Sequence, residues 1–480
     1  MPDDLFGNPV PPRQRPCRKR RAREEDQRPL PQRIADCAAF PDLYALARVL
    51  DTASPRRRGG RPAHYPPYVY LLFLAVRGVY GSARTTAGHL QHPTVWNEIK
   101  KGVAQHLGTD EAARLPELGP SRNHWQHAQR SLLIPHLEDL NAACRDLALK
   151  QALRQGLLPL TAPRSWSHPA RHQLLVGDGT VAKAPTLATT PYTLDETTGE
   201  IRRRRVDPAA WPQTEGGGRP VRGTKFIVFS ARRTGYLRRV VITYRHVPHH
   251  HPGGEAAAAI ETATELLDHP DAAGCLGLVY DGACRGTHRD TLHRRGRLLI
   301  NKQHDGLTPV PLHTLDYPRC RHELWAHGGR VTERTYRDDG TSTLTPLPIT
   351  RLQRRGQHTR HRWYHQITVP CPHGPHHHRE GVGITTTPGE RPPGQSDAER
   401  KFHRAEHLVP IPPGTKTHEE IYSHRDDAES VFAQFDRHLF NGRLIAFGAP
   451  AQSLVMLGFL LAQNATSAAR HHEDPTPHQH

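Results

Sequence analysis

Three acidic side chains that lie far apart in the sequence have the chemistry of a divalent-cation site. Asp178 stands between two glycines after an apolar run, Asp281 ends the run LGLVYD, and Glu429 belongs to a late helical segment. Carboxylates brought together repel one another unless a cation joins them, and Mg²⁺ accepts hard oxygen ligands while keeping water positions open. Two such ions support in-line displacement at phosphorus. An Asp beside a Gly is also typical of a plain turn, so the prediction depends on all three acids together.

The third acid lies in the segment 417–439, which we predict to be one amphipathic helix. At 100° per residue its apolar side chains share one buried stripe, formed by Ile421, Ala428, Phe432, Phe435 and Leu439. Tyr422, Arg425 and Glu429 form a second stripe about 80° away. A phenol, a guanidinium and a carboxylate at this rim could all address one phosphodiester.

Two simpler interpretations of this helix stay open. Arg425 and Glu429 are four residues apart, a spacing that also gives an ordinary surface ion pair. Asp426 shares part of the rim stripe and competes with Glu429 for the metal role, whereas Asp427 points away from it.

The order of strands and helices between residues 173 and 304 predicts where the two aspartates lie. Runs rich in Val, Ile, Phe and Tyr alternate with turn signals and helical patterns, giving strand, strand, strand, helix, strand, helix, strand. This order predicts an α/β sheet in which the first and fourth strands are neighbours. Asp178 and Asp281 would then meet at matching strand ends. A polar hairpin or loop over 181–222 separates the first strand from the second.

The N-terminal third differs in composition from the rest. Residues 1–60 are rich in Pro, Arg and Gln and are predicted as a disordered basic arm and linker, with one short helix over 36–52. Residues 61–165 show only helical patterns and are predicted as an all-α domain that could bind DNA. Candidate phosphate contacts in it are Arg84, Arg122 and Arg130.

The remaining chain is predicted as an interrupted catalytic domain. Its first part covers 166–304 and its last helices cover 416–470. Between them, residues 305–415 alternate in polarity and are punctuated by Pro and Gly, which indicates a β-rich insertion. Residues 471–480 form a tail.

Charge and cysteine usage limit the class of protein. The chain has 65 Lys and Arg against 47 Asp and Glu, a net charge of +18 and a pI near 9.9, which indicates a polyanionic partner such as nucleic acid. Seven scattered cysteines without a CxxC motif indicate a reducing compartment and argue against a disulfide-rich secreted protein. No stretch has the ~20 apolar residues of a membrane span, and no signal peptide is evident. We therefore predict a soluble, cytoplasmic protein.

Two C-x-H pairs in the insertion suggest a different kind of metal site. Cys320 and His322 form one pair, and Cys371 and His373 form the other. Two thiolates and two imidazoles could bind zinc tetrahedrally. Because the spacing fits no common zinc module, structural zinc is the less favoured of the two metal predictions.

The late helix resembles a signature of the bacterial insertion-sequence DDE transposases, in the branch that carries a β-strand insertion. That signature is Y-x2-R-x3-E-x6-K, and Tyr422, Arg425 and Glu429 match it in identity and spacing. The lysine position falls on Asp436 with Arg437 beside it. The resemblance therefore moves the phosphate-anchoring role to Arg437 or leaves it unfilled.

This resemblance covers residues 170–465 and implies an RNase H-like mixed sheet with flanking helices that carries out DNA transposition. Water would cleave the transposon ends, and the freed 3′-hydroxyl would attack target DNA. The implied roles are Mg²⁺ or Mn²⁺ ligands for two ions at Asp178, Asp281 and Glu429, DNA phosphate contacts at Tyr422, Arg425 and Arg437, and stacking of a flipped base on Trp325 or Trp363. The implied partner is double-stranded DNA, both inverted-repeat ends and target, bound by a homodimer associated with the bacterial nucleoid.

Two further functions fit the same residues. A catalytically inactive or domesticated DNA-binding derivative would explain the missing lysine at Asp436. A metal-dependent RNase H-like nuclease would use the same three acids without strand transfer. The tryptophans named for base stacking, Trp325 and Trp363, are equally typical of a packed core.

Overall fold

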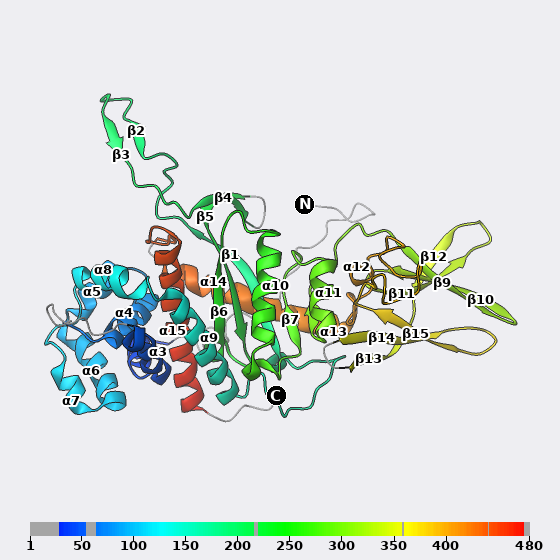
Figure 1. Ribbon diagram of the computed structural model, residues 1–480, viewed down its shortest axis with the longest axis horizontal. Coiled ribbons are helices and arrows are strands. Elements are labelled where there is room, and N and C mark those ends of the chain that lie inside the picture. Colours follow the sequence, from blue (N-terminus) through cyan, green and yellow to red (C-terminus); the bar gives the residue numbers. More distant parts are fainter. Residues whose placement is uncertain (1–27, 54–63, 216–218, 358–359, 440, 475–480) are drawn as a thin grey trace, which may run out of the picture.

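A curled mixed β-sheet lies at the centre of this computed structural model, which describes residues 28–53, 64–215, 219–357, 360–439 and 441–474 (Figure 1). Its strands are β1 (Leu174–Lys183), β4 (Trp211–Glu215), β5 (Arg219–Ala231), β6 (Val240–Val247), β7 (Gly277–Val279) and β8 (Leu298–Ile300). They lie in the order β6-β5-β1-β7-β8, and β4 pairs with the first part of β5. β5 is antiparallel to β1 and β6, whereas β7 is parallel to β1 and β8.

The register of β1 and β7 brings the two predicted aspartates to the same end of the sheet. Val176 lies opposite Val279 in this parallel pair, and Asp178 and Asp281 each follow two residues later. The prediction that the first and fourth strands are neighbours is thus confirmed. The strand β1 continues past this point because it stays paired with β5 as far as Lys183.

Helices cover both faces of the sheet: α10 lies in front of it in Figure 1 and α14 behind it. Their bounds are α10 (Gly254–Leu267), α11 (Gly286–Arg294), α13 (Lys416–Tyr422), α14 (Asp426–His438) and α15 (Ala449–Glu473). Because side chains alternate along a strand, β5 contributes to both cores. Ile227 and Phe229 are buried in the cluster with the alanines of α10, and Phe226 and Val228 in the cluster with Phe432 of α14.

The chain before the sheet is helical, in agreement with the predicted pattern. The helices are α2 (Leu30–Ala38), α3 (Pro41–Ala53), α4 (Pro67–Tyr80), α5 (Ala83–Leu90), α6 (Pro93–Leu107), α7 (Thr109–Arg114), α8 (Arg122–Ala128) and α9 (Leu137–Arg154), with a π-helical turn at Gln129–Leu133. Helix α4 packs closely on α15, since a Cβ on Gly78 would lie 2.4 Å from the carbonyl oxygen of Gly458. In the part of the chain that the structure describes, no helix is both long enough and apolar enough to cross a bilayer.

The prediction of a disordered arm before residue 36 is wrong for residues 30–35, which are helical. The helices α2 and α3 replace the single helix expected over 36–52, and α2 begins at Leu30. Ile34, Leu43 and Leu46 are fully or almost fully buried in the core shared with α4 and α15. Pro41 stands at the start of α3, where proline is well tolerated, so it divides the two helices and does not end the helical segment. The rest of the predicted arm and linker, residues 1–27 and 54–63, lies outside the described residues.

The predicted polar hairpin and the β-rich insertion are both present. The hairpin β2 (Tyr192–Leu194) and β3 (Ile201–Arg203) extends far from the sheet (Figure 1). The insertion contains β9 (Val310–Tyr317), β10 (Cys320–His327), β11 (Arg330–Tyr336), β12 (Ser342–Pro346), β13 (Ile349–Gln357), β14 (Arg360–Val369) and β15 (His376–Val382), followed by the short helix α12 (Arg404–His407). These strands form two sheets, in the orders β12-β11-β10-β9 and β13-β14-β15.

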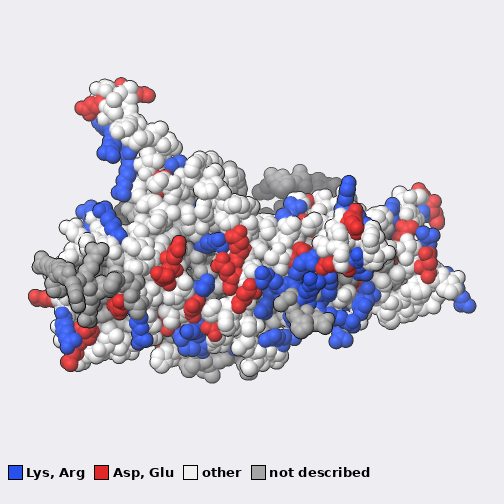
Figure 2. Space-filling view, in the orientation of Figure 1, with Lys and Arg blue, Asp and Glu red and all other residues white. Residues whose placement is uncertain are grey.

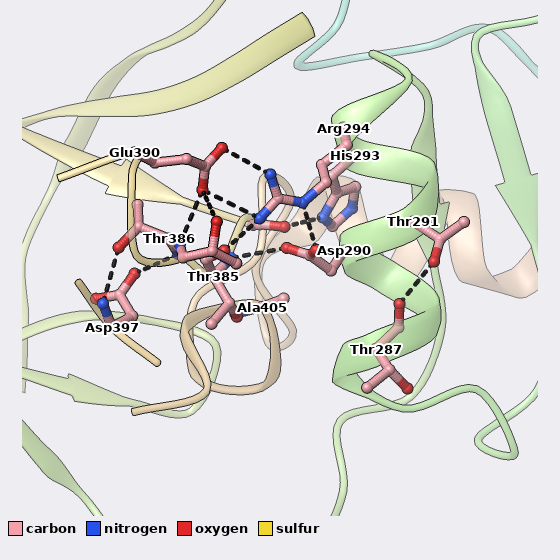
Figure 3. A network of polar contacts seen from close by, with 12 residues as sticks. Thr287, Asp290, Thr291, His293, Arg294, Thr385, Thr386, Glu390, Asp397 and Ala405 are labelled. Carbon is pink, nitrogen blue, oxygen red and sulfur yellow. Dashed lines mark hydrogen bonds and ion pairs between the residues drawn. The ribbon is translucent and has the colours of Figure 1, made fainter. Parts of the chain in front are cut away.

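A polar network fastens the insertion to α11, the helix that follows Asp281 (Figure 3). Asp290 accepts a hydrogen bond from the backbone nitrogen of Thr385 at 2.7 Å and pairs with Arg294 at 2.5 Å. Arg294 also pairs with Glu390 at 2.9 Å. Burial raises the pKa of Glu390, but hydrogen bonds from Arg294 and from the segment around it outweigh burial and hold that pKa at about 2. The insertion is therefore anchored to the helix that connects Asp281 with β8.

Candidate metal centre

Asp178 and Asp281 meet as predicted, and a third carboxylate joins them that the sequence interpretation missed. The ligand oxygens of Asp178, Glu255 and Asp281 all lie within 4.8 Å of one another. Glu255 belongs to the first turn of α10, directly after two glycines with positive φ. A carboxylate is favoured there by the helix dipole. The only sequence signal was a Glu at a helix start, which is too common to indicate a site.

The carboxylate of Glu255 is held by two hydrogen-bond donors. Its Oε2 accepts a hydrogen bond from Lys225 Nζ at 2.6 Å, and its Oε1 accepts one from the Tyr280 hydroxyl at 3.1 Å. Gly179 makes the approach to β1 possible, because a Cβ at this position would lie 2.2 Å from Oε1. The second glycine of the GDG motif therefore creates the space in which the third acid sits.

The site carries negative charge that Lys225 and Arg425 balance only in part. Burial and then the neighbouring charge of Asp281 raise the pKa of Asp178 to about 7. Burial also raises the pKa of Asp281, against the hydrogen bond that its Oδ1 accepts from the backbone nitrogen of Ala283 at 2.9 Å. A bound divalent cation would favour the ionised form of both groups.

Arg425 connects this group to Glu429. Its Nη1 lies 3.7 Å from Oδ2 of Asp178, and its Nη2 donates to Oε1 of Glu429 at 2.6 Å. The side chain of Glu429 is 57% exposed and lies outside the group formed by the other three acids. A guanidinium thus stands between Asp178 and the predicted third ligand, whose metal role stays a prediction.

The segment that carries the signature is divided into three consecutive elements. In place of one helix over 417–439, α13 ends at Tyr422, a 3₁₀ turn spans Ser423–Arg425, and α14 begins at Asp426. The predicted apolar stripe is buried throughout, so the amphipathic character is confirmed. Asp427 lies on the inner side of α14, where it is 1% exposed and pairs with Arg171 and Arg232. Asp427 therefore has a structural role, while Asp426 is exposed beside the site.

Tyr422 is positioned next to Asp281 by α13. Its ring stacks on His418 at a centroid distance of 5.5 Å, and Nε2 of His418 contacts the backbone oxygen of Asn301 at 3.2 Å. The side chain of Asn301 in turn donates to the backbone oxygen of Asp281 at 3.3 Å. The phenol is half-buried at the rim, where it could contact a phosphate.

Arg437 lies away from Tyr422 and Arg425. It is in the last turn of α14, about 12 Å along the helix from Glu429. There it lines a cavity of about 320 Å³ together with Arg33 and His438. A phosphate contact by Arg437 would involve a different point on the DNA backbone from one by Arg425.

The two tryptophans named for base stacking differ in accessibility. Trp363 is 1% exposed, its indole nitrogen donates to the backbone oxygen of His293 at 2.8 Å, and it packs against Trp166. It is a core residue in this conformation. Trp325 is half-buried, and the guanidinium of Arg334 lies 4.7 Å above its ring. Trp325 is the accessible candidate.

The three arginines of the helical region gather around one cavity. Arg84, Arg122 and Arg130 line a space of about 540 Å³ that also includes Arg205 from the stem of the hairpin. The guanidinium of Arg205 stacks at 3.8 Å on the ring of Phe447. Side chains predicted separately as phosphate contacts thus face a common space between the N-terminal helices and the sheet region.

The second predicted metal site is present with one of its four residues replaced by another. Cys320, His322 and Cys371 lie together as proposed, but the fourth ligand atom within 4.8 Å belongs to His376 and not to His373. The turn after Cys371 accounts for the difference: the backbone nitrogen of His373 faces the Cys371 sulfur at 3.5 Å, and β15 then begins at His376.

Among the described residues, three groups have metal-binding chemistry: the carboxylates on the central sheet, the thiols and imidazoles in the insertion, and a second group in the insertion formed by His313, His378 and Glu380. Arg425 and Tyr422 stand at the rim of the first. In comparisons with known proteins, no family model and no curated protein matches the sequence.

Proposed function

We propose that this chain is a DDE-type DNA transposase that cleaves transposon ends and joins the 3′-hydroxyl to target DNA. The observation that carries the proposal is the meeting of Asp178 and Asp281, each two residues past the last paired residues of the parallel strands β1 and β7. Arg425, from the 3₁₀ turn 144 residues after Asp281, reaches Asp178. An aspartate that served only in a turn would not be expected to meet charged side chains from two distant segments.

The sheet topology supports an RNase H-like domain as part of this proposal. Three antiparallel strands are followed by two strands parallel to the first, in the order β6-β5-β1-β7-β8. The β-rich insertion separates β8 from α13 and α14. This is the organisation that the resemblance to DDE transposases implies.

The residues present fit divalent metal ions. Asp178, Asp281 and Glu255 give a set of hard oxygen donors, and burial raises the pKa values of both aspartates although Arg425 acts in the opposite direction. Glu429 would join them when Arg425 turns away. When bound, Mg²⁺ or Mn²⁺ would supply Lewis-acid stabilisation of charge on the phosphate and activation of water.

The chain's own residues would bind and orient the DNA strand. Arg425 balances the charge of Asp178 and Glu429 in the free protein, and its guanidinium matches a phosphate equally well. A phosphate arriving at the rim would therefore exchange with Glu429 as its partner. The Tyr422 hydroxyl lies on the same rim and would donate to a second phosphate oxygen.

Basic surface supports double-stranded DNA as the partner. Figure 2 shows Lys and Arg gathered where α11 meets the sheet β13-β14-β15 and along the stem of the hairpin. Burial, followed by repulsion from Arg297 and Arg164, lowers the pKa of Arg354 to about 10. Arginines that repel one another are stabilised by a polyanion, and binding should weaken steeply with salt. The side chain of Ile201 in the hairpin is 73% exposed. It would offer an apolar contact to the second copy in the proposed homodimer.

The test uses the DNA that flanks the gene. The purified protein should cut at the inverted repeats in the presence of Mg²⁺ or Mn²⁺, and Asp178→Asn and Asp281→Asn should not. Supplying pre-cut ends then separates a transposase, which joins them to target DNA, from a nuclease, which does not. Cutting by both variants at the parental rate would disprove the assignment.

A catalytically inactive DNA-binding derivative is the second candidate. Glu429 lies outside the group of three acids, and Asp436 stands where the signature has lysine. This candidate predicts salt-dependent binding to the repeats without cleavage under any metal condition.

A further inference from the structure

The Cys/His group, formed by Cys320, His322, Cys371 and His376, joins the two sheets of the insertion. Cys320 and His322 lie on β10, two residues apart and hence on one face of the strand. Cys371 lies in the turn between β14 and β15, and His376 is the first residue of β15. All four ligand atoms lie within 4.8 Å of one another. We propose that this group binds one structural zinc ion.

The ring of His322 is held so that one of its nitrogens is left available to bind a metal ion. Its Nδ1 lies 2.6 Å from Oε1 of Glu333 on the neighbouring strand β11. Its Nε2 is buried and has no hydrogen bond of ordinary geometry, although the Cys371 thiol faces it. A histidine held by a carboxylate through one nitrogen, with the other nitrogen free, is the usual arrangement around bound zinc.

The spacing of the donors suits a tetrahedral ion. Zinc bonds of about 2.0–2.3 Å place neighbouring ligand atoms about 3.4–3.8 Å apart. Sγ of Cys320 lies 3.1 Å from Nε2 of His376, and the remaining separations stay below 4.8 Å. The ring of His376 is fixed by stacking on Tyr317 at a centroid distance of 3.8 Å. Small side-chain shifts suffice to place four donors around one ion.

The bound ion would act as a cross-link. Two ligands come from the sheet β12-β11-β10-β9 and two from the segment that ends β14 and starts β15. These sheets belong to separate hydrogen-bonded ladders. Four protein ligands leave no open position, which distinguishes this site from a catalytic one. The inference does not depend on the proposed function.

A neighbouring group of similar composition is a weaker candidate. His313, His378 and Glu380 also lie within 4.8 Å of one another. Arg404 already pairs with Glu380 at 2.5 Å and supplies positive charge there, and the side chain of His313 is 38% exposed. We therefore expect one tightly bound ion in the insertion and not two.

The experiment compares substitutions of His376 and His373, which are three residues apart in the sequence. Full-length protein, purified without chelator, should contain one zinc ion per chain by elemental analysis. His376→Ala should reduce the content to below about one tenth, because a three-ligand site binds far more weakly, while His373→Ala should leave it unchanged. Replacement by Co²⁺ should give a thiolate-to-metal charge-transfer band that His376→Ala removes. His378→Ala should have no effect on zinc content.

Several outcomes would overturn the proposal. They are zinc-free protein that does not take up Co²⁺ with a thiolate band, loss of zinc in His373→Ala but not in His376→Ala, and a Cys320–Cys371 disulfide found by mass spectrometry of the freshly purified chain. If His376→Ala fails to fold, the parent protein is titrated with a mercurial thiol reagent in the presence of a coloured zinc indicator, which reports zinc release and thiol modification together. Release of one zinc ion together with exposure of two thiols supports the site, and release of none rejects it.

Discussion

The acidic group on the central sheet and the Cys/His group in the insertion are stabilised in different ways. In the acidic group, burial and mutual repulsion raise the pKa of Asp178 to about 7, while Lys225 and Arg425 balance part of the charge. In the Cys/His group, Glu333 orients His322 so that its free nitrogen faces the other ligands. The first group is charged and borders an exposed rim, and the second is complete with four donors. An open, electrostatically strained site suits chemistry, and a closed one suits cross-linking.

The sharpest test of this contrast is the removal of an aspartate. Asp178→Asn or Asp281→Asn should reduce metal-dependent cleavage of the end DNA by about 10³-fold or more, since each removes a charged ligand worth several kcal/mol. The zinc content of both variants should stay at the parental level. Cleavage is measured on labelled repeat DNA, with binding at low salt as the control for folding. A variant that lost zinc along with activity would show that the two groups are not independent.

The two glutamates near the acidic group rank next in expected effect. Glu255 is already paired with Lys225 and bonded by Tyr280, so Glu255→Gln should slow cleavage by about 10-fold. Glu429 is exposed and pairs with Arg425, and we expect Glu429→Gln to slow cleavage by about 10²-fold because in the proposed mechanism this acid would complete the site on DNA. Single-turnover cleavage at saturating metal measures both. The reverse ranking would mean that the group is complete without Glu429.

The sequence predicted the parts of both groups that depend on local order. The succession of strands and helices brought Asp178 and Asp281 together, because adjacent parallel strands end at the same edge. Glu255 could not be predicted in this way, since its position depends on how α10 packs against Gly179. His376 was missed because the C-x-H spacing favours His373, whereas the turn containing Gly374, at φ 112°, redirects the chain before β15 begins. The position of Glu255 thus depends on long-range packing, and that of His376 depends on the conformation of a single turn.

A smaller effect is expected from the carboxylate behind His322. Glu333→Gln keeps the shape of the side chain but weakens the hydrogen bond to Nδ1, so zinc affinity should fall by about 10–100-fold. Competition with a coloured chelator measures the change. Glu323→Gln is the matched control, because Glu323 is next to His322 in sequence but accepts a hydrogen bond from Tyr336. Equal effects of the two substitutions would contradict the assigned role of Glu333.

The smallest predicted effect is a change in the stability of the metal-free protein. The pKa of Asp178 is raised by burial to about 7 from an ordinary value of 3.8, so the folded state binds more protons than the unfolded state between these values. Stability therefore increases as pH falls from above 7 toward 4, and the cost of the buried charge is fully present above pH 7.

Asp178→Asn removes this cost. In the presence of chelator, the melting temperature at pH 8 should rise by about 2–4 °C relative to the parent, and the difference should vanish near pH 4. Cys320→Ser, in contrast, should give no such gain at either pH, because Cys320 carries no comparable buried charge in the metal-free protein. Thermal denaturation of the three proteins at both pH values measures the difference. A destabilised Asp178→Asn protein at pH 8 would show that Arg425 and the backbone of Gly179 already compensate the carboxylate, and that the acidic group is no more strained than the Cys/His group.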